Sequence, residues 1–127
     1  MKSLFLTFAL LAISACSTFD PVKHAETLEQ KGYAAYGTFV IYEEQGAKLI
    51  ADPAVSDNIK SSIQRADAVA KPAADAARDA TLEVSRVKKA FEAAETTEDT
   101  LVLVTETLDQ EIKTFKPLLD RLIDAVD

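Results

Sequence analysis

Apolar residues recur at intervals of three and four along much of the chain, and this spacing strongly limits the folds it can adopt. One series begins at Ile59 and Ile63 and continues to Phe91, with many alanines in its middle. It forms one face of a helix of about 40 residues, or about 60 Å if the helix is unbroken. A second series, Leu101–Val126, has the same spacing and an acidic opposite face. The pattern predicts long amphipathic helices that pack against one another.

Local signals mark the starts of these helices and two interruptions. Ser56 precedes an acidic first turn and is a good N-terminal cap for the middle helix. The run Thr96–Asp99 predicts a turn followed by an N-terminal cap for the last helix. Pro72 and Pro117 lie inside the two helices, and a bend is expected at each because proline lacks the N–H and its ring clashes with the preceding turn. A break at Pro72 would give four helices instead of three.

The first helix is expected from about His24 to Ile50, ahead of the stop at Asp52-Pro53. A strand competes over residues 38–42, which are β-branched and aromatic and have glycine nearby. Helix is the better prediction because a lone strand would have no partner. Short connections between long helices imply antiparallel neighbours. The predicted fold class is therefore all-α: a three-helix (alternatively four-helix) antiparallel bundle with long, proline-kinked helices.

The first 16 residues have the order of an export signal. Lys2 supplies positive charge, Leu4–Ala12 forms an apolar run, and Ile13-Ser14-Ala15-Cys16 places small residues before the only cysteine. A secretory signal peptide has this order. The apolar run is shorter than the roughly 20 residues that a membrane span needs. The last four residues resemble the lipobox of bacterial lipoproteins.

This resemblance implies processing and lipidation at one residue. Cleavage would fall between Ala15 and Cys16, after which the Cys16 sulfur carries diacylglycerol and its amino group an acyl chain. Ser17 stands where lipoproteins kept in the inner membrane of many enterics have aspartate, which favours the periplasmic side of the outer membrane. The expected organisation is a signal peptide over residues 1–15, a lipidated tether over 16–23 and a single helical domain over 24–127.

The net charge of the chain limits the classes of partner that it can bind. The formal net charge is −7 at pH 7. Nucleic acid is not expected as a partner, because phosphates require clustered lysine and arginine. Anionic headgroups would also repel the chain, so the lipid on Cys16 is expected to provide its attachment to the membrane.

The sequence predicts no catalytic centre, metal site or cofactor beyond the covalent lipid. His24 is the only histidine, and the only cysteine is the expected lipidation residue Cys16. A transition-metal site would need several histidine or cysteine ligands. Carboxylate pairs such as Glu43 with Glu44, and Asp120 with Asp124, are explained by solvated faces or helix starts. The glycines do not form a phosphate-binding loop. The chain is therefore not expected to be an enzyme.

A run of aromatic residues in the first helix is the candidate partner-binding patch. Tyr33, Tyr36, Phe39 and Tyr42 recur every three residues and therefore drift around the helix. Some rings could form an exposed patch, although the simpler expectation is that they fill a core. The expected function is a binding or structural role in the bacterial envelope with a protein partner, and a homo-oligomer is left open. The alternative is a phage or plasmid lipoprotein, such as an exclusion or lysis accessory factor.

Overall fold

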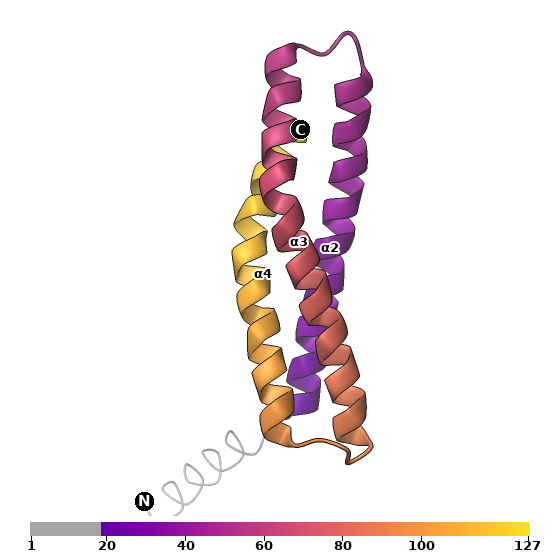
Figure 1. The fold of residues 1–127 in the computed structure, drawn as a ribbon, viewed down its shortest axis with the longest axis vertical. Coiled ribbons are helices and arrows are strands. Elements are labelled where there is room, and N and C mark those ends of the chain that lie inside the picture. The colour runs from indigo at the N-terminus through magenta and orange to yellow at the C-terminus, as the bar shows by residue number, and fades with distance from the viewer. Residues whose placement is uncertain (1–18) are drawn as a thin grey trace, which may run out of the picture.

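The computed structural model describes residues 19–127 and contains three long α-helices (Figure 1). They are α2 (Pro21–Ala51), α3 (Asp57–Glu92) and α4 (Glu98–Val126). The prediction of an all-α fold with three helices is confirmed over the described residues. The competing strand at residues 38–42 is wrong, because that segment lies inside α2. The signal peptide and the lipidation residue Cys16 lie outside the described residues.

Each helix begins at a side chain that caps its first turn. The Asp20 carboxylate accepts hydrogen bonds from the Val22 and Lys23 N–H groups at 3.0 and 3.3 Å. Pro21 suits the first helical position, where its missing N–H would be unpaired anyway. The first helix therefore begins at Pro21 rather than near His24. The final residues assigned to the tether thus belong to the helix and its cap.

The two other caps are confirmed. Ser56 Oγ accepts a hydrogen bond from the Ile59 N–H at 3.4 Å. Thr97 Oγ1 accepts one from the Thr100 N–H at 3.3 Å. Each helix therefore starts where its local sequence satisfies a backbone donor that would otherwise be unpaired.

Pro72 does not divide the middle helix, so the four-helix alternative is wrong. α3 continues through it, and the proline is exposed while Ala70 and Ala74 on either side are buried. Packing of the inner face thus holds both halves of the helix in place despite the missing hydrogen bond. Pro117 likewise lies on the exposed side of α4. The bends expected at the two prolines stay predictions.

The two connections lie at opposite ends of an elongated molecule (Figure 1). Near the start of α2, Glu29 pairs with Lys88, which lies near the end of α3. Near the end of α2, Gly46 lies close to Ile63 at the start of α3. Every pair of helices is in contact. The core therefore runs along the whole bundle rather than sitting at one end.

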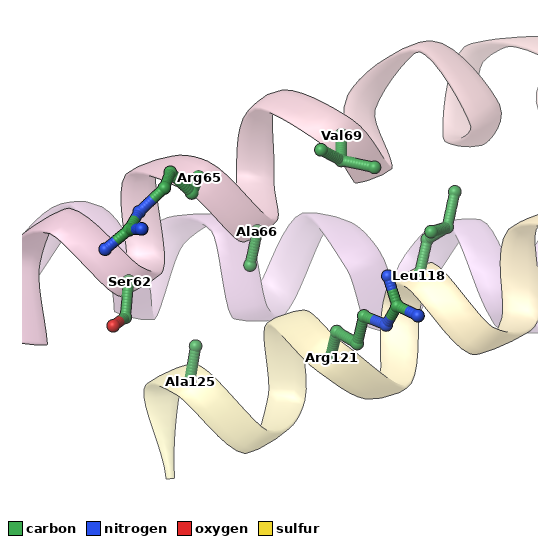
Figure 2. A pocket seen from close by; sticks show the side chains of 7 residues that line it. All are labelled: Ser62, Arg65, Ala66, Val69, Leu118, Arg121 and Ala125. Carbon is green, nitrogen blue, oxygen red and sulfur yellow. The ribbon is translucent and has the colours of Figure 1, made fainter.

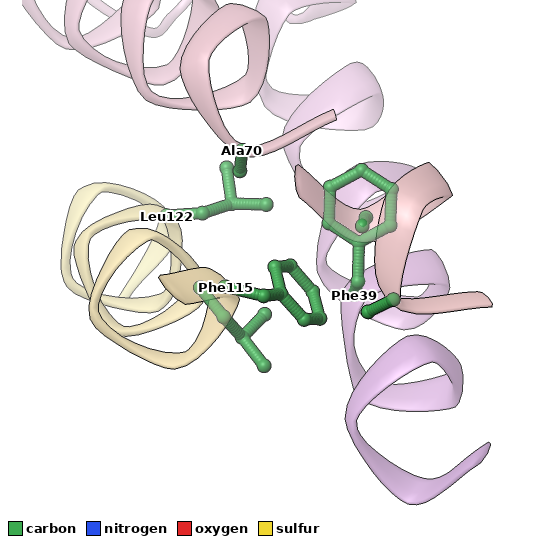
Figure 3. Packing of buried hydrophobic residues seen from close by; sticks show 7 residues of the cluster. Phe39, Ala70, Phe115 and Leu122 are labelled. Carbon is green, nitrogen blue, oxygen red and sulfur yellow. The ribbon is translucent and has the colours of Figure 1, made fainter. Parts of the chain in front are cut away.

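The core consists of two clusters stacked along the bundle. The cluster nearer the α2–α3 connection contains a phenylalanine from α2 and one from α4, Phe39 and Phe115. Their rings meet edge to face, with centroids 5.9 Å apart and planes at 76° (Figure 3). Small alanines on α3 leave the space that these rings fill. The other cluster contains Ala25, Leu28, Val84, Val87, Leu101 and Leu108.

Candidate functional site

The structure does not bring the four predicted aromatic residues together on one surface. Phe39 is only 2% exposed and belongs to the core, whereas Tyr33 is 48% exposed. Tyr36 and Tyr42 are half-buried. The drift around the helix therefore separates the rings into buried, partly buried and exposed positions.

The two half-buried tyrosines make contacts within the bundle. The Arg78 guanidinium lies over the Tyr36 ring, 5.6 Å from its centroid, and Nη1 donates a 3.4 Å hydrogen bond to the phenol oxygen. The Tyr42 hydroxyl donates to Asp127 Oδ2 at 3.4 Å. These contacts link α2 to α3 and to the residue that follows α4. Of the predicted patch, Tyr33 alone has an exposed side chain.

A second surface, which the sequence did not suggest, lies between α3 and α4 (Figure 2). It is an open groove of about 420 Å³. α3 contributes side chains at spacings of three and four residues, which places them on one helical face. α4 contributes three more with similar spacing. The lining residues are Ser62, Arg65, Ala66, Val69, Leu118, Arg121 and Ala125.

The charges of this α3–α4 groove differ from those elsewhere on the protein. The chain has four arginines. Arg78 pairs with Asp79 at 3.0 Å, and Arg86 pairs with Glu83. Within residues 19–127, no carboxylate lies within ion-pair distance of Arg65 or Arg121, and Arg65 Nε donates only to a backbone oxygen of its own helix. The two arginines that lack a carboxylate partner among residues 19–127 thus line the same groove.

A polar network joins α2 to α3 near the other end of the bundle. Lys88 Nζ lies 2.9 Å from Glu29 Oε1 and 3.9 Å from Glu26 Oε1. Ser85 Oγ donates a 3.1 Å hydrogen bond to Glu29 Oε2. The bond to Glu29 raises the pKa of Lys88. Since both members of the main ion pair are largely buried, the network restricts how the two helices align.

Glu43 and Asp67 form a carboxyl pair between the same two helices. Burial raises the pKa of Glu43, and hydrogen bonding to Asp67 raises it further, whereas the charge of Lys71 lowers it. The pair borders a pocket of about 170 Å³ whose other walls are mainly apolar. The sequence alone pairs Glu43 with its neighbour Glu44 and gives no signal for Asp67, which is distant along the chain. The negative charge of Asp67 also raises the pKa of Glu43, because two neighbouring carboxylates repel each other.

Among residues 19–127, no group of at least three His, Cys, Asp or Glu is placed so that it could hold a metal ion. His24 instead packs near the Phe19 ring, with centroids 6.0 Å apart. None of α2, α3 and α4 combines the length and apolar character needed to cross a membrane.

The α3–α4 groove is therefore the surface best suited to binding. It combines volume, the exposed side chain of Val69 and two arginines that no described carboxylate neutralises. Sequence spacing places its residues on helical faces but does not reveal which two faces meet. Comparisons with protein-family models, curated proteins and solved structures found no match to this chain.

Proposed function

We propose that this chain is a lipid-anchored, non-enzymatic protein of the bacterial envelope, attached to the periplasmic side of the outer membrane through Cys16. The carrying observation is the order of the N-terminal residues. A positive charge and an apolar run lead to Ile13-Ser14-Ala15-Cys16, and the chain has no other cysteine. Two or three acyl chains at Cys16 would make membrane attachment durable, because one chain alone binds only marginally.

The position of the first helix supports a body held close to its anchor. Only Ser17–Asp20 separates Cys16 from the start of α2 at Pro21. Five residues from Cys16 to Asp20 span at most about 17 Å when extended. The 31 residues of α2 extend about 46 Å beyond that point. The end of the bundle with the α2–α3 connection would therefore lie far from the membrane.

We also propose that the helices form an antiparallel bundle bent at Pro72 and Pro117. The pairing of Glu29 with Lys88, and the approach of Gly46 to Ile63, support opposite directions for α2 and α3. In this arrangement the acidic body is repelled by anionic headgroups and projects from the bilayer. The α3–α4 groove supports a role in binding a protein partner within the envelope.

Acyl labelling tests the anchor. Cells that express the parent or the Cys16→Ser variant are fed an alkyne-tagged palmitate, and membrane and soluble fractions are compared. The parent should take up label and sediment with membranes, whereas Cys16→Ser should lose the label and be released. Ser17→Ala is the matched control and should keep the label. The proposal fails if the parent takes up no label and the Cys16→Ser variant still sediments with membranes.

A further inference from the structure

The α3–α4 groove combines an apolar floor with positive charge in an acidic protein. Ala66, Val69 and Leu118 contribute to the floor, and Val69 is 54% exposed. Arg65 and Arg121 come from different helices and lie on either side of Ala66 in Figure 2. A ligand that neutralises both arginines must carry carboxylates. The same ligand must also have an apolar surface to cover the exposed methyl groups. Charge complementarity therefore favours an acidic, amphipathic ligand.

The shape of the groove favours a helical ligand. Its lining residues follow α3 and α4 lengthwise, and small side chains at Ala66 and Ala125 allow close approach. In a three-helix bundle, a groove between two helices is where a fourth helix packs, at an axis distance of about 8–10 Å. Amphipathic helices bind such grooves through apolar residues spaced three and four apart.

We propose that the α3–α4 groove binds an acidic amphipathic helix of a protein partner. Small apolar residues of that helix cover Val69 and Leu118, while carboxylates on its two flanks pair with Arg65 and Arg121. Guanidinium groups suit this role because they can hold a carboxylate with two parallel hydrogen bonds. The inference deepens the proposed binding role and rests on it for the location of the partner, but the contact itself does not require the lipid anchor.

Two nearby occupants fit less well. Residues 1–18 contain no aspartate or glutamate, so they cannot neutralise the arginines. Lipids of the anchoring membrane are distant, because the groove lies near the start of α3 and the end of α4, away from the N-terminal end of the bundle (Figure 1). A second copy of this chain also carries acidic helices, and sedimentation of the purified chain distinguishes this occupant from a different protein.

A displayed library of helical peptides tests the proposal. Alanine and leucine occupy the positions that face the groove, and the flanking positions vary among Glu, Gln and Lys. Selection uses the purified full chain in detergent micelles. We expect Glu to be enriched over Lys at the flanks. The selected peptides should lose about tenfold or more in affinity when Arg65→Glu and Arg121→Glu are combined, and should weaken as salt rises.

The matched control reverses the charge of two lysines outside the groove. Lys31→Glu with Lys116→Glu changes the net charge equally, and Lys116 lies roughly 200° around α4 from Leu118. All four basic side chains are exposed, so both double variants should keep the circular dichroism of the parent. The control should bind the peptides within about twofold of the parent.

Several results would overturn the proposal: no selected binder, enrichment of Lys, or equal losses in the two double variants. Sedimentation of the purified chain supplies the last test. We expect a monomer, and a dimer that dissociates on reversal of Arg65 and Arg121 would assign the groove to a second copy instead. Failure of acyl labelling at Cys16 would refute the anchor but leave the peptide results unchanged, so the two proposals fail separately.

Discussion

Replacing Gly32 by alanine should destabilise the bundle, although alanine is the better helix former. A Cβ atom at this position would overlap Thr81 Oγ1 and lie 3.2 Å from both Thr81 Cβ and Cγ2. Thr81 is fully buried, and its hydroxyl donates a 2.6 Å hydrogen bond to the Ala77 carbonyl. The side chain therefore cannot turn away without losing that bond, and α2 and α3 must separate instead.

The size of the effect follows from two opposing terms. Alanine gains about 1 kcal/mol over glycine in a helix interior. Overpacking a buried contact costs about 1–3 kcal/mol. Because the hydroxyl of Thr81 is held in place, we expect the upper part of that range and a net loss of about 1–2 kcal/mol. For a domain of this size the loss lowers Tm by about 4–8 °C.

Gly37 provides a matched control in the same helix. Apart from the neighbouring turns of α2 itself, no atom would lie within 4 Å of a Cβ at this position, so Gly37→Ala should raise stability by about 0.5–1 kcal/mol. Urea unfolding followed by circular dichroism measures both variants. Thr81→Ala should relieve much of the cost of Gly32→Ala, giving a favourable coupling of about 1 kcal/mol in a double-mutant cycle. The reasoning is refuted if Gly32→Ala is as stable as Gly37→Ala, or if the cycle shows no coupling.

Three further substitutions probe other contacts. Glu43→Gln should raise Tm at neutral pH. Because the pKa of Glu43 is raised in the folded state, the parent loses stability as the pH rises from the ordinary pKa of glutamate through the raised pKa. The gain in Tm should therefore shrink on acidification, as measured by thermal melts from about pH 4 to about pH 8. Lys88→Met should cost about 3–5 kcal/mol in urea unfolding, because it removes the cation that pairs with the largely buried Glu29. Phe39→Ala should cost about 3–5 kcal/mol, whereas Tyr33→Ala should stay within about 0.5 kcal/mol.

Each of these three predictions has a result that would contradict it. A Tm gain in Glu43→Gln that is constant with pH would contradict the raised pKa of Glu43. The double variant Glu29→Gln/Lys88→Met should recover most of the stability lost in Lys88→Met, and no recovery would mean that the ion pair is not the cause. Equal losses in Phe39→Ala and Tyr33→Ala would contradict the separation of buried and exposed rings.

Features set by a few neighbouring residues could be predicted from the sequence. The caps at Ser56 and Thr97 depend on a side chain and a backbone N–H three residues later, and both are present. The sequence prediction starts the first helix too late, near His24, because it assigns Asp20-Pro21 to the tether. These two residues combine a cap with a proline suited to the first turn. The continuity of α3 through Pro72 depends on packing against other helices, which local sequence does not show.

The contacts between helices could not be predicted. Spacing gives the angle between Tyr33, Tyr36 and Phe39, but it does not say which side of the helix meets the core. The pairing of Glu43 with Asp67, and the meeting of Arg65 with Arg121 at one groove, depend on the alignment of separate helices. Alignment results from packing along the whole bundle, such as the close approach at Gly32.

The attachment of the chain to the membrane at Cys16 is the central claim, and mass spectrometry of the N-terminal peptide tests it most directly. Protein purified from membranes is digested with trypsin, which cleaves after Lys23. The account predicts that the first peptide is Cys16–Lys23, with a diacylglyceryl group on the sulfur and an acyl chain on the amino group. A Ser3–Lys23 peptide, which an uncleaved chain would give because trypsin also cuts after Lys2, or a Cys16–Lys23 peptide without lipid, would contradict it.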